Sequence, residues 1–185
     1  MKLVTQAMIF AAEKHDGAVR KASNIPYIVH PMEAVEIVAT MTKDQELLAA
    51  AVLHDTVEDT DTTVEQIRTE FGDRIASLVA SESDTMPEGV SEEDSWHARK
   101  QAAIDRLARA SHDAKIVALG DKLSNMRAIA RDYAQQGDAL WNLFHAKDPK
   151  EHEWHYRGLA DSLRELQETF AYQEFEQLIN QVFKH

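Results

Sequence analysis

Two features of this sequence predict an all-α fold. Glycine and proline are scarce, with six Gly and four Pro in 185 residues, which favours helices over a turn-rich β architecture. Apolar residues recur at helical spacing in several segments, and no segment shows sustained apolar–polar alternation bounded by turns. We therefore expect a helical protein without a β-sheet.

The first half of the chain is expected to form helices joined by short connections. Pro31 suits the first turn of a helix, where a backbone N–H has no partner within the helix. Thr62 or Thr63 can cap a later helix, and Gly72 can end it. The expected helices span residues 1–15, 30–41, 44–57, 64–71 and 73–83.

The second half is expected to begin with an exposed loop and to continue as longer helices. Residues 83–95 combine a proline, a glycine and several acidic residues, which is typical of a surface loop. Further breaks are expected at residues 134–138 and 146–150. The expected helices span residues 95–110, 113–133 and 151–172, with a final segment to residue 183.

Composition limits the possible function. A chain of this length forms one domain of residues 1–185 and can bury a sizeable core. The absence of cysteine excludes disulfides and thiolate zinc sites, and the N-terminal apolar stretch is too short to span a membrane. The net charge of −12 argues against nucleic acid as the main partner. We expect a cytoplasmic protein that acts on a small molecule.

The stretch "AVLHDTVEDTD" (residues 51–61) places acidic residues at the end of an apolar run, beside His54 and Asp55. Like charges three or four residues apart destabilise a helix by roughly 0.2–0.5 kcal/mol per pair, so this clustering needs a reason. A solvated acidic face is one explanation. A metal site is another, because His30 precedes Pro31 at a helix start and Asp121 follows a second apolar run.

These two histidines and two carboxylates would suit Mn²⁺, Fe²⁺ or Mg²⁺, with coordination positions left for water and substrate. The residues also allow simpler explanations. His30 could be a surface histidine, and Asp121 could be a core acid paired with Lys122 or Arg127.

Three motifs in order, "PYIVHP", "HDTVEDT" and "GDKLSNMR", resemble the HD-type hydrolase domain of RelA/SpoT homologues, and especially the small alarmone hydrolases. The resemblance covers residues 1 to about 133, while residues 134–185 are expected to be C-terminal helices that pack on this core. It implies a compact helical bundle. It also implies removal of pyrophosphate from the 3′ position of guanosine tetra- or pentaphosphate, (p)ppGpp, usually with Mn²⁺.

The resemblance also assigns roles to individual residues. The implied metal ligands are His30, His54, Asp55 and Asp121. The implied catalytic residues are Glu58 and Asp59, which would position and activate the attacking water, and Asn125. The implied substrate-binding residues are Arg20, Lys21, Tyr27, Asn125 and Arg127. His15 and Tyr27 also match motif positions, and for either of them a structural role is as plausible as a functional one.

The sequence departs from the family at positions that affect the substrate more than the chemistry. Ser124 stands where the family usually has His or Tyr, and Gly120 stands where Ala is usual. After "ASLV" (residues 76–79) the family often carries a Thr–Lys-type signature, but residues 80–89 contain no lysine. An adenosine alarmone, (p)ppApp, could therefore be the substrate, and Arg99 and Lys100 could replace the missing cation. Another HD nucleotide phosphohydrolase, acting on deoxynucleotides or NADPH, and a catalytically idle nucleotide-binding module remain alternatives.

Two aromatic clusters in the last third are expected to serve packing. Residues 145–156 contain three histidines, a tryptophan and a tyrosine, with a spacing that fits no common metal-ligand pattern. We expect a helix that packs aromatic side chains there. The second cluster, expected in the core or at a subunit contact, consists of Phe170, Tyr172, Phe175 and Phe183.

Overall fold

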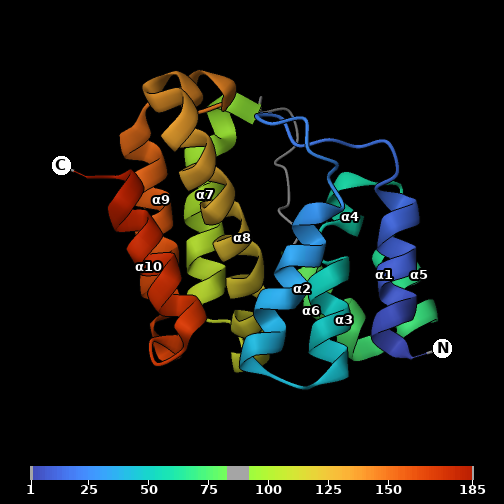
Figure 1. Cartoon of the computed structure of the whole chain (residues 1–185). Helices are drawn as coiled ribbons and strands as arrows, with labels where there is room; N and C mark the ends of the chain where they lie inside the picture. Colours follow the sequence, from blue (N-terminus) through green and yellow to red (C-terminus); the bar gives the residue numbers. More distant parts are fainter. Residues whose placement is uncertain (1, 83–91, 185) are drawn as a thin grey trace. The chain divides into compact units, whose positions relative to one another are not determined.

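A computed structural model describes residues 2–82 and 92–184 of the chain (Figure 1). These residues form helices and no β-sheet, which confirms the predicted all-α class. The single β-type pairing recorded among them is an isolated bridge between Val19 and Pro26. The elements are α1 Leu3–Lys14, α2 Val29–Met41, α3 Gln45–Leu53, α4 Thr56–Asp59, α5 Val64–Phe71, α6 Asp73–Glu82, α7 Glu92–Ala108, α8 His112–Gln136, the 3-10 helix η1 Gly137–Leu143, α9 Pro149–Ser162, the 3-10 helix η2 Arg164–Leu166 and α10 Phe170–Val182.

The chain folds into two compact units. The first consists of Met1–Ser83 and Ser111–Ser124, and the second of Asp84–Ala110 and Asn125–His185. Helix α8 contributes its first half to the first unit and its second half to the second. The expectation that residues 134–185 pack on a core of residues 1–133 stays a prediction.

Helix α3 is the centre of the first unit. Every residue from Leu47 to Leu53 is buried, and the helix packs against α1, α2 and α6. A helix that is apolar all round must be enclosed by other elements, because no side of it gains from contact with water. This enclosed helix carries His54 at its C-terminal end.

A glycine allows α8 to approach α2 closely. A Cβ atom at Gly120 would lie 2.8 Å from the carbonyl oxygen of Ala34 and 2.6 Å from the Cγ2 atom of Val38. Real Cβ atoms essentially never come within 3.0 Å of such neighbours. The absence of a side chain at residue 120 therefore permits this spacing, and the next residue in α8 is Asp121.

The structure corrects one helix boundary beside the proposed site. The sequence predicts a continuous helix over residues 44–57, but α3 ends at Leu53 and α4 begins at Thr56. The Thr56 hydroxyl donates a 2.7 Å hydrogen bond to the Leu53 carbonyl oxygen, which supports the turn between them. The predicted capping of α5 is confirmed, because Thr63 accepts a hydrogen bond from the Gln66 N–H and Gly72 ends the helix with φ of 95°.

The second unit contains another corrected boundary. The predicted helix over residues 151–172 is interrupted, because α9 ends at Ser162 and α10 begins at Phe170. The Thr169 side chain caps α10 by accepting a hydrogen bond from the Tyr172 N–H. The predicted loop at residues 83–95 falls largely outside the described residues, and its last part, from Glu92, belongs to α7.

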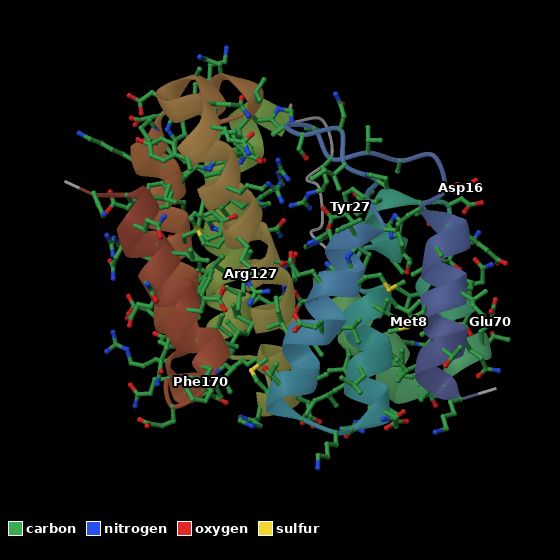
Figure 2. All side chains as sticks on the ribbon, in the orientation of Figure 1. Met8, Asp16, Tyr27, Glu70, Arg127 and Phe170 are labelled. Atoms are coloured by element: carbon green, nitrogen blue, oxygen red, sulfur yellow. The ribbon has the colours of Figure 1, made fainter. Side chains whose placement is uncertain are left out.

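The aromatic residues of the second unit are mostly core. His152 is buried and stacks on Trp141 with ring centroids 5.0 Å apart, which agrees with the expected packing role. Tyr172, Phe175 and Phe183 are buried as expected. Phe170 does not belong to this core, because 89% of it is exposed at the start of α10 (Figure 2).

Candidate metal centre

The C-terminal end of α3 delivers an almost fully buried imidazole. His54 is 1% exposed, and its Nδ1 lies 2.8 Å from the carbonyl oxygen of Ala51. A carbonyl oxygen can only accept a hydrogen bond, so Nδ1 of His54 is the donor and Nε2 faces the interior. The backbone of α3 therefore orients His54.

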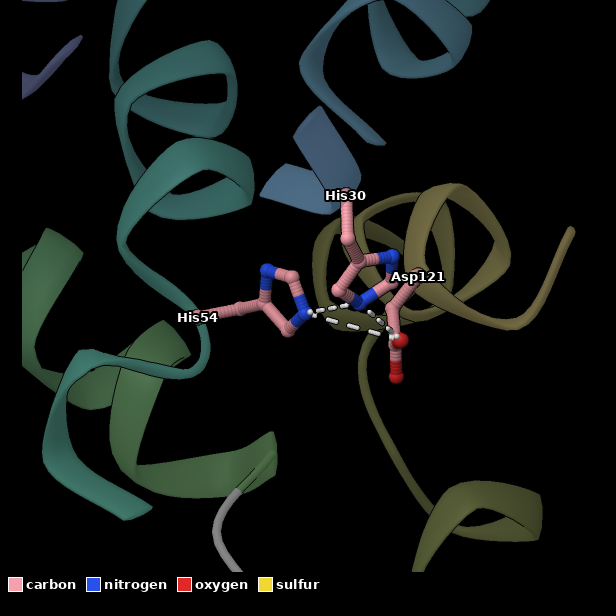
Figure 3. A group of neighbouring side chains, drawn as sticks. All are labelled: His30, His54 and Asp121. Carbon is pink, nitrogen blue, oxygen red and sulfur yellow. Dashed lines mark hydrogen bonds and ion pairs between the residues drawn. The ribbon is translucent and has the colours of Figure 1, made fainter. Parts of the chain in front are cut away.

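Two other elements direct side chains to the same point. His30 comes from the first turn of α2 and Asp121 from α8, and both are buried (Figure 3). The Nε2 atoms of His30 and His54 lie 3.2 Å apart. Oδ1 of Asp121 lies 3.2 Å from Nε2 of His30 and 3.5 Å from Nε2 of His54. These three residues form the group of potential metal ligands found among the described residues.

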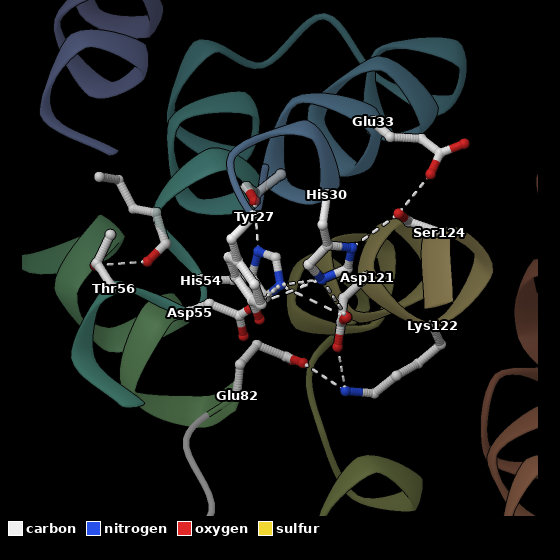
Figure 4. A network of polar contacts seen from close by, with 12 residues as sticks. Tyr27, His30, Glu33, His54, Asp55, Thr56, Glu82, Asp121, Lys122 and Ser124 are labelled. Carbon is white, nitrogen blue, oxygen red and sulfur yellow. Dashed lines mark hydrogen bonds and ion pairs between the residues drawn. The ribbon is translucent and has the colours of Figure 1, made fainter. Parts of the chain in front are cut away.

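Asp55 places a second carboxylate against both imidazoles. Its Oδ2 lies 3.0 Å from Nε2 of His54 and 3.3 Å from Nε2 of His30. The Tyr27 hydroxyl donates a 2.6 Å hydrogen bond to the same oxygen and so restrains the carboxylate (Figure 4). Burial and the nearby Asp55 charge raise the pKa of Tyr27, which keeps this hydroxyl a donor.

The charges of the group stabilise one another. Burial lowers the pKa of His54, but Asp55 and Asp121 outweigh this effect and hold it well above its ordinary value. Burial raises the pKa of Asp121, but Lys122 and His54 more than offset it and hold that pKa well below the usual range. Both carboxylates next to the imidazoles are therefore ionised near neutral pH. Ionised carboxylates are the form that binds a cation.

A partly buried ion pair supports Asp121 from the side away from the histidines. The Lys122 ammonium group contacts Oδ2 of Asp121 and lies 3.4 Å from Oε2 of Glu82 (Figure 4). Burial lowers the pKa of Lys122, but Asp121 and Glu82 raise it well above its ordinary value, so the lysine stays charged. Burial raises the pKa of Glu82.

The donor set fits a divalent cation. Ligands about 2.0–2.2 Å from one ion, at right or tetrahedral angles, lie about 2.8–3.6 Å from each other. The distances that join the two Nε2 atoms to each other, and each Nε2 to the nearest oxygens of Asp55 and Asp121, run from 3.0 to 3.5 Å. Facing lone pairs and carboxylates repel one another unless protons or a cation lie between them. Imidazole nitrogen with carboxylate oxygen suits first-row divalent ions.

The predicted catalytic acids follow Asp55 along the chain. Glu58 and Asp59 are exposed residues of α4, the short helix that Asp55 precedes. Desolvation near the site and the charge of Asp55 raise the pKa of Asp59. Asn125 is half-buried in α8, four residues after Asp121.

The predicted substrate-binding residues have more varied surroundings. The Arg20 guanidinium lies over the Tyr27 ring, 5.7 Å from its centroid, which connects it to the site through Tyr27. Lys21 is exposed on the same loop. Arg127 belongs to the second unit, where its guanidinium makes two 2.7 Å hydrogen bonds to Glu174. These roles stay predictions.

Sequence reasoning missed a hydrogen-bonded pair behind His30. Ser124 accepts from the His30 ring and donates to Glu33. Glu33 lies three residues after His30 in α2, so helical spacing alone could have indicated that the two residues share a face. No signal in the sequence indicates that Ser124, from α8, lies between them. The alternative in which Asp121 pairs with Lys122 is also realised, because Asp121 contacts both the lysine and the histidines.

Comparison with models of known protein families identifies the family of this chain. A family model described as "HD domain" matches residues 7–149. The chain belongs to the HD domain family. No helix among the described residues of this HD domain protein is long and apolar enough to cross a membrane.

Two curated relatives match more than two thirds of this chain. The guanosine-3′,5′-bis(diphosphate) 3′-pyrophosphohydrolase MESH1 of Danio rerio is 36% identical over 132 residues, which is 70% of this chain and 70% of that protein. The protein of the same name from Homo sapiens is 39% identical over 132 residues, 68% of this chain and 69% of its own.

Solved structures share the HD domain fold. Lmo0812 from Listeria monocytogenes EGD-e is 26% identical, with a TM-score of 0.73 over 86% of this chain and 98% of that chain. A metazoan ortholog of SpoT described as hydrolysing ppGpp has a TM-score of 0.79 over 98% of this chain and 96% of its own. At 24% identity, the second likeness concerns the fold alone.

Proposed function

We propose that this chain hydrolyses the 3′-pyrophosphate of a nucleotide alarmone, with guanosine 3′,5′-bis(diphosphate) as the leading substrate, and releases pyrophosphate. The observation that carries the proposal is the convergence of two imidazoles and two carboxylates in the first unit. This arrangement occurs in an HD domain protein whose relatives at 36% and 39% identity carry the name of that enzyme. The chain is proposed to act as a single cytoplasmic domain.

The proposed metal ligands are His30, His54, Asp55 and Asp121, and the proposed ion is Mn²⁺. Such an ion supplies Lewis-acid chemistry when bound, polarising a phosphoryl oxygen and lowering the pKa of water. The protein holds the donors in place before binding, because α3 orients His54 and Tyr27 restrains Asp55. Donors held in this way need little rearrangement to accept the ion.

Glu58 is proposed as the general base. It lies three residues after Asp55 and four after His54, and its exposed carboxylate can take a proton from the attacking water and pass it to solvent. Asp59, whose pKa is raised, is proposed to position that water, and Asn125 to hydrogen-bond the phosphoryl group.

Local cations are proposed to hold the substrate, because the net charge of −12 repels an anionic nucleotide at long range. Arg20 and Lys21 lie on the loop that also carries Tyr27, and Arg20 stacks on that ring. Arg127 is proposed as a further contact. It would have to exchange or share its ion pair with Glu174 to reach a phosphate.

A substrate panel tests the proposal. Purified protein with Mn²⁺ would be incubated with ppGpp, ppApp, deoxynucleoside triphosphates and NADPH, and the products separated by ion-exchange chromatography. We expect ppGpp or ppApp to yield the nucleoside diphosphate and pyrophosphate, with no turnover in Asp121→Ala or after chelation. Phosphate released from NADPH, or triphosphate from deoxynucleotides, with both alarmones intact would replace this proposal by another HD phosphohydrolase activity. A panel without any turnover would favour an idle binding module.

A further inference from the structure

Ser124 links a proposed metal ligand to a carboxylate on the same unit. The Ser124 hydroxyl oxygen lies 2.8 Å from Nδ1 of His30 and 2.6 Å from Oε2 of Glu33 (Figure 4). Ser124 is 1% exposed and His30 is 4% exposed, so the hydrogen bond between them is shielded from water, whereas the bond to Glu33 is only partly buried. The proposed reaction assigns no step to Ser124 or Glu33.

The chemistry of the two contacts fixes the direction of the hydrogen bonds. An ionised carboxylate only accepts, so the Ser124 hydroxyl must give its single proton to Glu33. The serine oxygen then has only lone pairs to offer His30, and Nδ1 of that ring must be the donor. Nδ1 of His30 therefore carries a proton, and its Nε2 faces His54, Asp55 and Asp121.

The two imidazoles of the centre are held in different ways. The backbone carbonyl of Ala51 orients His54, and no side-chain substitution removes that acceptor. His30 instead depends on two side chains from different helices, Glu33 in α2 and Ser124 in α8. Partners behind a ligating histidine fix its tautomer and increase its basicity, and their loss typically weakens metal binding about 10–100-fold.

We propose that Ser124 and Glu33 are positioning residues that hold the His30 ring with Nε2 directed at the metal centre, and that Glu33 acts through Ser124. This inference deepens the proposed function, because it names the residues that hold one metal ligand in position. It rests on the proposed function only in taking His30, His54, Asp55 and Asp121 as the metal site. It requires no particular nucleotide.

Titration of the metal-free protein with Mn²⁺ alone, followed by electron paramagnetic resonance of the free ion, tests the proposal without nucleotide. We expect Ser124→Ala to weaken Mn²⁺ binding at least about tenfold, because Nδ1 loses its acceptor. We expect Glu33→Gln to weaken it at least about threefold. The amide can still accept from Ser124 but carries no charge, and its N–H₂ group can reverse the hydrogen bonds.

The double variant Ser124→Ala/Glu33→Gln distinguishes a relay from two separate effects. If Glu33 acts through Ser124, the second substitution should add less than about twofold to the first. Glu36→Gln is the matched control, since it removes the same charge from an exposed position of α2, and we expect Mn²⁺ binding within twofold of wild type. Circular dichroism would verify that each variant is folded.

A nitrogen-15 NMR spectrum of the wild-type protein loaded with Zn²⁺ keeps the proposal testable should Ser124→Ala fail to fold. We expect the retained ring proton of His30 on Nδ1 and the metal on Nε2. A proton on Nε2, additive effects in the double variant, or wild-type Mn²⁺ affinity in a folded Ser124→Ala would overturn the proposal. Failure of the proposed function has another signature, in which wild-type protein binds Mn²⁺ tightly but hydrolyses no alarmone.

Discussion

Replacing Gly120 by alanine tests whether the close approach of α8 to α2 builds the metal centre. The new Cβ would lie 2.8 Å from the backbone oxygen of Ala34 and 2.6 Å from a methyl group of Val38, so α8 must move away. Overpacking of this kind costs about 1–3 kcal/mol. Alanine recovers about 1 kcal/mol of helix propensity. The net expectation is a loss of about 1 kcal/mol in the free energy of unfolding.

Gly158→Ala in α9 is the matched control, because it is the same substitution in another helix. Its Cβ would meet the end of the Ile104 side chain at 2.6 Å, and that side chain can rotate, whereas a backbone oxygen cannot. We expect Gly158→Ala to raise the free energy of unfolding by about 0 to 1 kcal/mol. This is the gain in helix propensity less the cost of moving the Ile104 side chain.

Differential scanning calorimetry of metal-free protein compares the Tm of Gly120→Ala and Gly158→Ala with that of wild type. For a chain of this size, 1 kcal/mol corresponds to about 2–4 °C in Tm. Gly120→Ala should therefore melt about 2–4 °C below wild type, and it should bind Mn²⁺ more weakly because Asp121 moves with α8. A Gly120→Ala protein as stable as Gly158→Ala, with unchanged Mn²⁺ affinity, would refute the reasoning.

Four further substitutions examine the ligands, the base and the substrate contacts. His54→Ala and Asp121→Ala should each lose bound metal by elemental analysis while circular dichroism stays helical, because each removes one ligand from a set of four. Glu58→Gln should retain the metal and slow turnover at least about 100-fold in steady-state assays, since an amide cannot take the proton. Arg20→Ala should raise KM about tenfold or more, since a charge-assisted hydrogen bond is worth about 1.5–3 kcal/mol.

Each of these expectations has an outcome that contradicts it. Unchanged metal content in both ligand variants would remove His54 and Asp121 from the centre. Metal loss in Glu58→Gln would make that residue a ligand instead of a base. For Arg20→Ala, the control is Lys43→Ala, an exposed cation between α2 and α3 that should leave KM and kcat within about twofold. An Arg20 variant that behaves like this control would move the phosphate contact elsewhere.

The sequence predicted the elements of the fold where local signals were strong. Thr63 and Gly72 have side-chain and backbone properties that suit helix ends, and α5 has those ends. The break at His54 was missed because residues 44–57 carry no glycine or proline, and the turn arises from contacts such as that of Thr56 with Leu53. The break before α10 was missed although Thr169 is a good cap, because helix periodicity outweighed it.

The candidate site was predictable as a set of residue types but not as a geometry. His30, His54 and Asp121 stand in motifs, and the structure brings their donor atoms together. The support from Ser124 depends on how close α8 comes to α2, which no local pattern encodes. Tertiary packing determines that distance, so only the folded chain reveals it.

Anomalous diffraction from crystals grown with Mn²⁺ would locate the proposed metal ion. We expect one strong manganese peak about 2.0–2.3 Å from Nε2 of His30, Nε2 of His54 and a carboxylate oxygen each of Asp55 and Asp121. Absence of a peak at these residues in crystals that contain manganese elsewhere, or a peak that lacks either histidine as a ligand, would contradict the proposed metal centre.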